Sequence, residues 1–161
     1  MARVYTKQGD VFCVKIDESH KKYFQLIAYD LTQLNSDVIR AFEKEYLMES
    51  QPSIAEIISD RVSFHAHCVT RFGIQLDFWK KIGSSKDVGD ISKIMFRDTN
   101  DYGADIKIST NWYIWHINDE DFTRVGKLTE EYKKAELGLV FNPENIVRKI
   151  RTGEFLSYYP D

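Results

Sequence analysis

The sequence predicts an α+β fold: a β-rich single domain, residues 1–161, with a strongly bent antiparallel sheet or a partly open barrel and two short helices. Two patterns lead to this prediction. Apolar residues alternate with polar ones in short runs separated by polar turns, which is typical of strands. Two other segments begin with residues that cap helices. The chain is 43% hydrophobic and 14% aromatic, so it has the apolar surface that a packed core requires.

The first run, residues 11–16, shows the pattern of the strands in the first half of the chain. Phe12, Val14 and Ile16 fall on one face of the strand, and the residues between them fall on the other. A polar turn then leads to a second strand, so the two are expected to form a hairpin. The strands expected in this half are residues 11–16, 23–29, 38–42 and 62–69.

Two helices are expected from the residues that begin them. Ser53 and Glu56 have the spacing of a capping box, which predicts a helix over residues 53–60. Asn142 followed by Pro143 predicts a second helix over residues 143–151, because proline at the first helical position loses no hydrogen bond.

The rest of the chain is expected to hold further strands and one loop. Residues 71–79 are ambiguous, but their alternating apolar residues favour a strand, and the polar, glycine-containing residues 83–90 predict a loop. Residues 112–117 are apolar on both faces, which indicates either a covered central strand or a half-exposed strand that presents its rings to a partner. The other expected strands are residues 94–96, 105–108, 125–128 and 137–141.

Charge and cysteine content limit the class of protein. The net charge of −3 gives no basic excess that would attract nucleic acid or an anionic membrane, so neither is an expected partner. Cys13 and Cys68 lie in strand-like runs and are expected to be reduced core residues. The sequence shows no apolar export segment and no apolar stretch long enough to span a membrane, so a cytoplasmic location is expected.

No motif in the chain indicates a particular reaction. Glycine-rich phosphate loops, the GxSxG turn and the HExxH motif are absent, so no catalytic residue and no cofactor is predicted. The best spacing for metal ligands is that of His65 and His67, which project from one face of a strand. A third ligand would have to be His116 or a carboxylate. The other interpretation is that both histidines lie on the solvent face of a half-buried strand.

Three segments of the first half resemble a known family. Residues 7–14 (KQGDVFCV), residues 24–27 (FQLI) and residues 37–42 (DVIRAF) resemble the immunity protein 26 family, which is grouped with the HocA-type phosphotriesterases. Its members are small bacterial cytoplasmic proteins, many of them encoded beside polymorphic toxins. The resemblance implies an immunity protein that binds and neutralises a cognate toxin without catalysis of its own. The alternative it implies is a small metal-dependent hydrolase of the phosphotriesterase type, which would use the His-x-His pair.

Acidic and aromatic residues are the expected contacts with such a toxin. If the toxin is a nuclease, its active-site face is basic and acidic groups would meet it. Tryptophan and tyrosine would anchor the contact if one face of residues 112–117 is open. The same acidic residues also fit solvated turns. The candidate partner-binding residues are Trp112, Tyr113, Trp115, Asp98, Asp101, Asp105, Asp119, Glu120 and Asp121.

Overall fold

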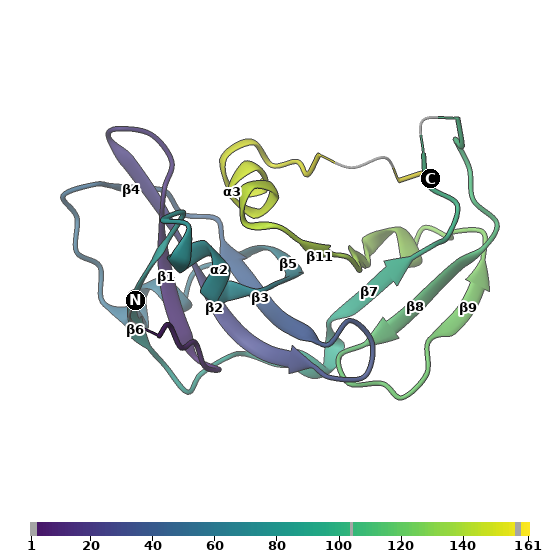
Figure 1. Ribbon diagram of the computed structural model, residues 1–161, viewed down its shortest axis with the longest axis horizontal. Helices are drawn as coiled ribbons and strands as arrows, with labels where there is room; N and C mark the ends of the chain where they lie inside the picture. Colours follow the sequence, from purple (N-terminus) through teal and green to yellow (C-terminus); the bar gives the residue numbers. More distant parts are fainter. Residues whose placement is uncertain (1–2, 104, 157–158) are drawn as a thin grey trace.

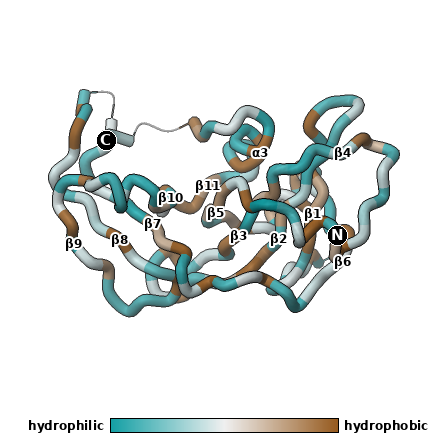
Figure 2. Tube along the Cα trace, turned by 180° about the vertical axis from the view of Figure 1, so that it is seen from behind, coloured by the Kyte–Doolittle hydropathy of each residue, from teal (hydrophilic) through white to brown (hydrophobic). Residues whose placement is uncertain are grey.

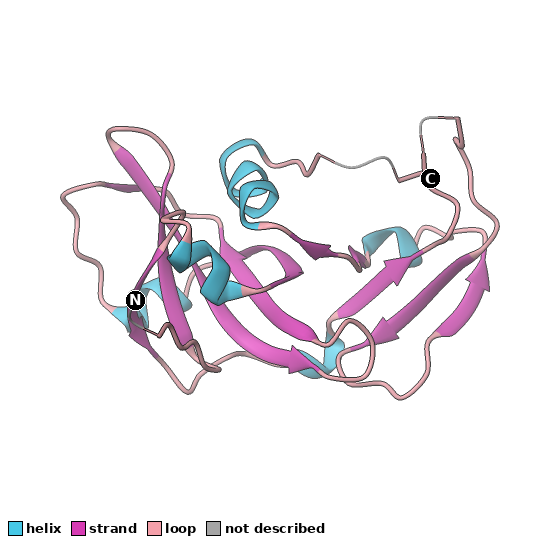
Figure 3. Cartoon of the chain, in the orientation of Figure 1, coloured by secondary structure: helices cyan, strands magenta, loops and turns pink. Residues whose placement is uncertain are grey.

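The computed structural model describes residues 3–103, 105–156 and 159–161. Within these ranges the chain forms two β-sheets, three α-helices and two short 3-10 helices (Figures 1 and 3). The larger sheet consists of β1 (Asp10–Lys15), β2 (His20–Asp30), β3 (Ser36–Phe42), β4 (Tyr46–Leu47), β5 (Val62–Cys68), β6 (Lys80–Ser84) and β11 (Val140–Phe141). The smaller sheet consists of β7 (Met95–Asp98), β8 (Trp112–His116), β9 (Thr123–Gly126) and β10 (Glu136–Leu137). The helices are α1 (Ile54–Ile58), α2 (Thr70–Gln75), α3 (Pro143–Thr152), η1 (Ile91–Lys93) and η2 (Tyr132–Lys134).

The larger sheet confirms the predicted α+β class and bent sheet. Its strands follow the order β11-β5-β3-β2-β1-β6, with β4 paired to β2, so the sheet has two free ends and does not close into a barrel. Most pairs are antiparallel, but β11 pairs with β5 in parallel and β10 pairs with β7 in parallel. The register shifts in the pairs β1–β6, β2–β3 and β3–β5, and such irregularities bend strands.

Both faces of the larger sheet are buried, and the alternation in β1 decides which residues go to each. Phe12 and Val14 pack with Ile146 and Ile150 of α3 on one face. The intervening Val11 and Cys13 belong to a second cluster, which includes Ile57 of α1. A third cluster joins Ile27 and Val38 of this sheet to Phe96 and Trp115 of the smaller sheet. Figure 2 shows apolar positions recurring along the strands and polar positions in the turns.

Both helix starts predicted from the sequence are confirmed. The Ser53 side chain accepts a hydrogen bond from the backbone N–H of Glu56 at 3.1 Å. The Asn142 side chain accepts one from the N–H of Asn145 at 2.8 Å, with Pro143 in the first turn. The prediction of only two helices is wrong, however, because α2 is a third.

The prediction of a strand over residues 71–79 is wrong, because α2 occupies the first part of this segment. Within it, Gly73 lies directly under the indole ring of Trp79, where any Cβ would overlap the ring. The Trp79 indole also donates to the carbonyl of Thr70 at 2.9 Å. The helix brings these groups together, and tertiary packing therefore overrides the local alternation.

Three other predicted segments differ from the structure. The strand expected over residues 137–141 is divided between β10 in the smaller sheet and β11 in the larger sheet. Residues 105–108 do not form a strand; the neighbouring Ser109 N–H instead donates to the carbonyl of Asp161 at 2.9 Å. Gly83 and Ser84, expected in a loop, end β6, which pairs with β1. Among the described residues, no helix has the length and apolar character needed to cross a membrane.

Candidate functional site

A buried polar cluster joins the two sheets. Asp30, at the end of β2, accepts hydrogen bonds at 2.9 Å from the Nε2 atom of His67 and the indole nitrogen of Trp115. Its second oxygen accepts from the backbone N–H of Asn118 at 3.2 Å. The side chains of Asp30 and His67 are both fully buried. Burial alone raises the pKa of Asp30, but the hydrogen bonds from His67, Trp115 and Asn118 outweigh it and lower that pKa below its usual range.

The two histidines of β5 do not lie on a solvent face, and this interpretation is therefore wrong. His67 is completely buried, with its ring centre 4.2 Å from that of Phe96 in the smaller sheet. His65 is mostly buried, and burial together with the charge of Arg40 lowers its pKa to about 4. The second face of β5 is covered because the smaller sheet packs against it.

The histidines proposed as metal ligands for the alternative hydrolase each have a different neighbour. His67 bonds to Asp30, His65 lies 3.9 Å from Glu136, and the half-exposed His116 lies 3.5 Å from Asp119. In the part of the chain that the structure describes, no three histidine, cysteine or acidic side chains gather as a metal site would need. No observation on the described residues therefore favours the hydrolase.

The two candidate tryptophan anchors are buried. Of the three aromatic candidates, only Tyr113 is partly accessible. Trp112 has no exposed surface and Trp115 is 2% exposed, so the open face that their role as anchors requires is missing. Each is covered on its own side of β8: Trp115 by the cluster at the junction and Trp112 by Arg97, whose guanidinium lies 4.9 Å from its ring centre. Tyr113 is half-buried and packs at a tilt against the more exposed Phe122, with 4.3 Å between ring centres.

The candidate acidic residues fall into two groups at opposite ends of β8. Asp98 lies opposite Tyr113 and accepts a hydrogen bond from its hydroxyl at 3.2 Å. Burial raises the pKa of Asp98, although hydrogen bonds from the Thr99 backbone and from two tyrosines partly oppose this. At the other end, Asp119 accepts from the backbone N–H of His116 at 2.8 Å, as in the turn interpretation, whereas Glu120 and Asp121 are exposed.

The segment between β7 and β8, here called the β7–β8 loop (residues 99–103 and 105–111), is tied at its base by side-chain hydrogen bonds. The hydroxyls of Thr99 and Ser109 lie 2.8 Å apart, and Asp101 accepts from Ser109 at 3.1 Å and from Asn111 at 2.7 Å. Beyond this base the loop presents exposed apolar and acidic side chains. They are Tyr102, Asp105, Ile106 and Ile108, with Tyr102 61% exposed.

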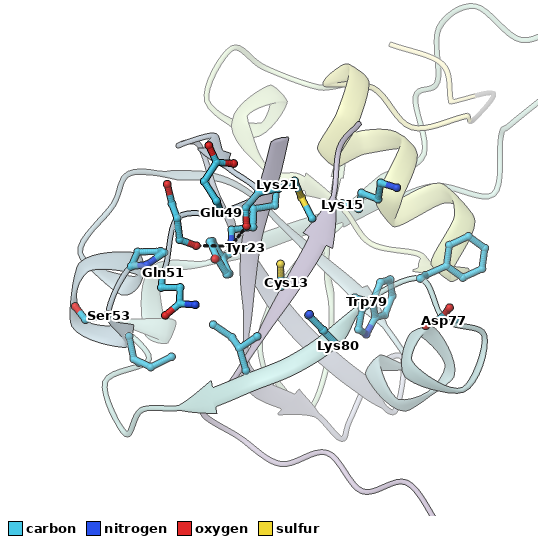
Figure 4. A pocket seen from close by; sticks show the side chains of 16 residues that line it. Cys13, Lys15, Lys21, Tyr23, Glu49, Gln51, Ser53, Asp77, Trp79 and Lys80 are labelled. Carbon is cyan, nitrogen blue, oxygen red and sulfur yellow. Dashed lines mark hydrogen bonds between the residues drawn. The ribbon is translucent and has the colours of Figure 1, made fainter. Parts of the chain in front are cut away.

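A cavity of about 800 Å³ lies on the other side of the molecule, over β1 and β6. Figure 4 shows Cys13 at its floor, with Lys21 and Tyr23 on one side and Lys80 and Trp79 on the other. Lys21 already donates to the carbonyls of Met48 and Ser50. Burial raises the pKa of the Cys13 thiol, and the nearby lysines only partly oppose this, so the thiol is not activated as a nucleophile.

Both cysteines were expected in the core, and the structure confirms this. Cys13 and Cys68 are buried, and neither forms a disulfide. The polar interior is organised by the side chains of Asp30, Gln25 and Arg40, none of which is predicted from the sequence. The signal for the last two was a long polar side chain inside a strand with apolar residues on both sides.

Comparison of the chain with protein-family models, with curated proteins and with solved structures finds no match. The function must therefore be argued from the residues and their geometry.

Proposed function

We propose that this chain is an immunity-type protein, which binds and neutralises a protein toxin in the bacterial cytoplasm without catalysing a reaction itself. The β7–β8 loop is the proposed contact surface, and the partner is a toxin whose active-site face is basic. A binding protein of this kind needs a stiff scaffold and an exposed patch that combines apolar and charged groups.

The main support is the way the β7–β8 loop is built. Its base is fixed by side-chain hydrogen bonds between Thr99, Asp101, Ser109 and Asn111. The loop therefore loses little conformational entropy when it binds a partner. The exposed Tyr102 supplies a ring of the type enriched at binding hot spots. Asp105, three residues farther along the chain, is also exposed, so its carboxylate can meet a basic surface.

The test is co-expression with the product of the adjacent gene, followed by a binding measurement. We expect that product alone to stop bacterial growth and this chain to restore it. In titration calorimetry, Tyr102→Ala and Asp105→Lys should each weaken binding at least about tenfold, as expected for a central contact.

A matched control variant distinguishes a wrong contact surface from a wrong function. Leu76→Ala changes a side chain that is also 61% exposed but lies at the end of α2, so it should leave binding unchanged. Binding that responds equally little to all three variants would show that the β7–β8 loop is not the contact. A neighbouring product that is harmless, or that does not bind, would contradict the function itself.

A further inference from the structure

A second cavity, of about 530 Å³, lies where the loop before β7 and the 3-10 helix η2 cover the larger sheet. Its walls combine ionisable side chains with apolar ones. Arg40 and His65 line it from β3 and β5, and Val88, Ile94 and Met95 line it from the covering loop and the start of β7. The volume lies within the range of small-molecule sites.

Arg40 is a buried cation that pairs with no carboxylate among the described residues. It is 8% exposed, and no aspartate or glutamate oxygen of the described residues lies within 4.0 Å of its guanidinium, although the Asp87 charge acts on it from farther away. Its Nε donates to the side-chain oxygen of Gln25 at 2.9 Å and its Nη2 to the carbonyl of Asp87 at 3.1 Å. Burying a charge that no counter-ion balances is costly, so an anion at this position would stabilise the fold.

Gln25 holds the guanidinium in place. Its amide nitrogen lies within 3.1–3.4 Å of the carbonyls of Gly9, Ser85 and Asp87, while its oxygen accepts from Arg40, so the fully buried amide is saturated. These bonds orient the Arg40 side chain and the covering loop together. A binding group held this way is preorganised, which reduces the entropy cost of capturing a ligand.

The third guanidinium nitrogen, Nη1, makes no hydrogen bond to a described residue and lies against Gly89. A Cβ at Gly89 would lie only 2.6 Å from it, so the glycine leaves this nitrogen uncovered. His65 lies on the neighbouring strand, directly opposite Arg40 in the pairing of β3 with β5. Since its imidazole is neutral at pH 7, one ring N–H can donate beside the guanidinium.

We infer that this cavity binds a small organic carboxylate, with the carboxylate group on Arg40 and His65 and the apolar part against Val88, Ile94 and Met95. This site is separate from the β7–β8 loop and does not depend on the proposed function. The other charged side chains around the cavity are Lys93, Lys134, Asp90, Glu131 and Glu136. With Arg40, three positive and three negative side chains line the cavity, so no net positive charge selects a doubly charged phosphate, and the apolar wall favours a ligand with a hydrocarbon part.

The test is a titration of the unmodified protein with hexanoate at pH 7 and constant ionic strength, followed by amide chemical shifts. The Gly89, His65 and Ile94 resonances should shift in a saturable way, with a dissociation constant of about 1 mM or below. Hexan-1-ol has no carboxylate and inorganic phosphate has no apolar part, so each should bind at least about tenfold more weakly. No saturable shift with hexanoate, or equal binding of phosphate, would overturn the proposal.

Two variants assign the binding to the cavity. Arg40→Gln should weaken hexanoate binding at least about tenfold, because a charge-assisted hydrogen bond is lost. Since loss of Arg40 could unfold the protein, Val88→Asp offers a second route: it places a carboxylate on the half-buried cavity wall and should abolish binding. Val125→Asp, at a half-buried position in β9, is the matched control and should bind as the unmodified protein does. Unchanged binding in folded Val88→Asp would place hexanoate elsewhere and overturn the proposal.

Discussion

Asp30 and Asp98 are both withdrawn from solvent, and each accepts a hydrogen bond from a ring on the same face of β8, Asp30 from Trp115 and Asp98 from Tyr113, but their surroundings act in opposite directions. Asp30 accepts from His67, Trp115 and the Asn118 backbone, and these hydrogen bonds lower its pKa in spite of its burial. At Asp98 burial outweighs the hydrogen bonds, and the pKa is raised. The contacts between the two sheets therefore stabilise the ionised form of Asp30, whereas the surroundings at the end of β7 disfavour the ionised form of Asp98.

The largest expected effect comes from removing the ring that links the junction to Asp30. Trp115→Ala should lower the free energy of unfolding by about 4 kcal/mol, because it leaves a cavity in the third cluster and removes a donor to a buried carboxylate. Tyr113→Ala, on the half-buried end of the same strand face, should cost about half as much or less. Urea unfolding followed by circular dichroism measures both. Equal losses would mean that the two ends of the sheet do not differ as described.

The next effect is that of the charge itself. Asp30→Asn should lower the free energy of unfolding at pH 7 by about 3 kcal/mol. The amide places an N–H₂ group opposite the donors of the cluster, so at least one buried donor loses its acceptor and the negative charge is removed. Since the pKa of Asp30 is lowered in the fold, the advantage of the carboxylate is present above about pH 4, the unfolded value, and is lost as the pH falls through the folded value.

Unfolding curves of the two proteins between pH 2 and pH 7, from about two units below to about three units above the unfolded value, test this second prediction. The difference between the unmodified protein and Asp30→Asn should shrink toward the acid end. A difference that stays constant with pH would show that the substitution acts through packing and not through the charge.

The sequence was sufficient for β1, β2, β3 and β5 of the larger sheet and for two helix caps, because these depend on neighbouring residues. Alternation assigned Phe12 and Val14 to one cluster and Val11 and Cys13 to another, as observed. It could not show that a second sheet covers His67, or that Gly73 must lie under Trp79, since these contacts join distant segments. The sequence named the acidic candidates but could not show how exposed each one is, because that depends on turns and on side-chain hydrogen bonds formed only in the folded chain.

The smallest expected effect is that of the same substitution at the other end of the sheet face. Asp98→Asn should lower the free energy of unfolding at pH 7 by no more than about 0.5 kcal/mol, and a slight increase is also consistent with the loss of a partly buried charge. The amide oxygen can still accept from Tyr113, and the buried charge is removed. Because the pKa of Asp98 is raised in the fold, its carboxylate becomes a disadvantage as the pH rises above the unfolded value, so any gain in Asp98→Asn should grow between pH 4 and pH 7, from about the unfolded value upward. Urea unfolding at these two pH values measures the gain. A loss as large as that of Asp30→Asn would mean that Asp98 also holds its sheet together through its charge, and the contrast between the two ends would no longer stand.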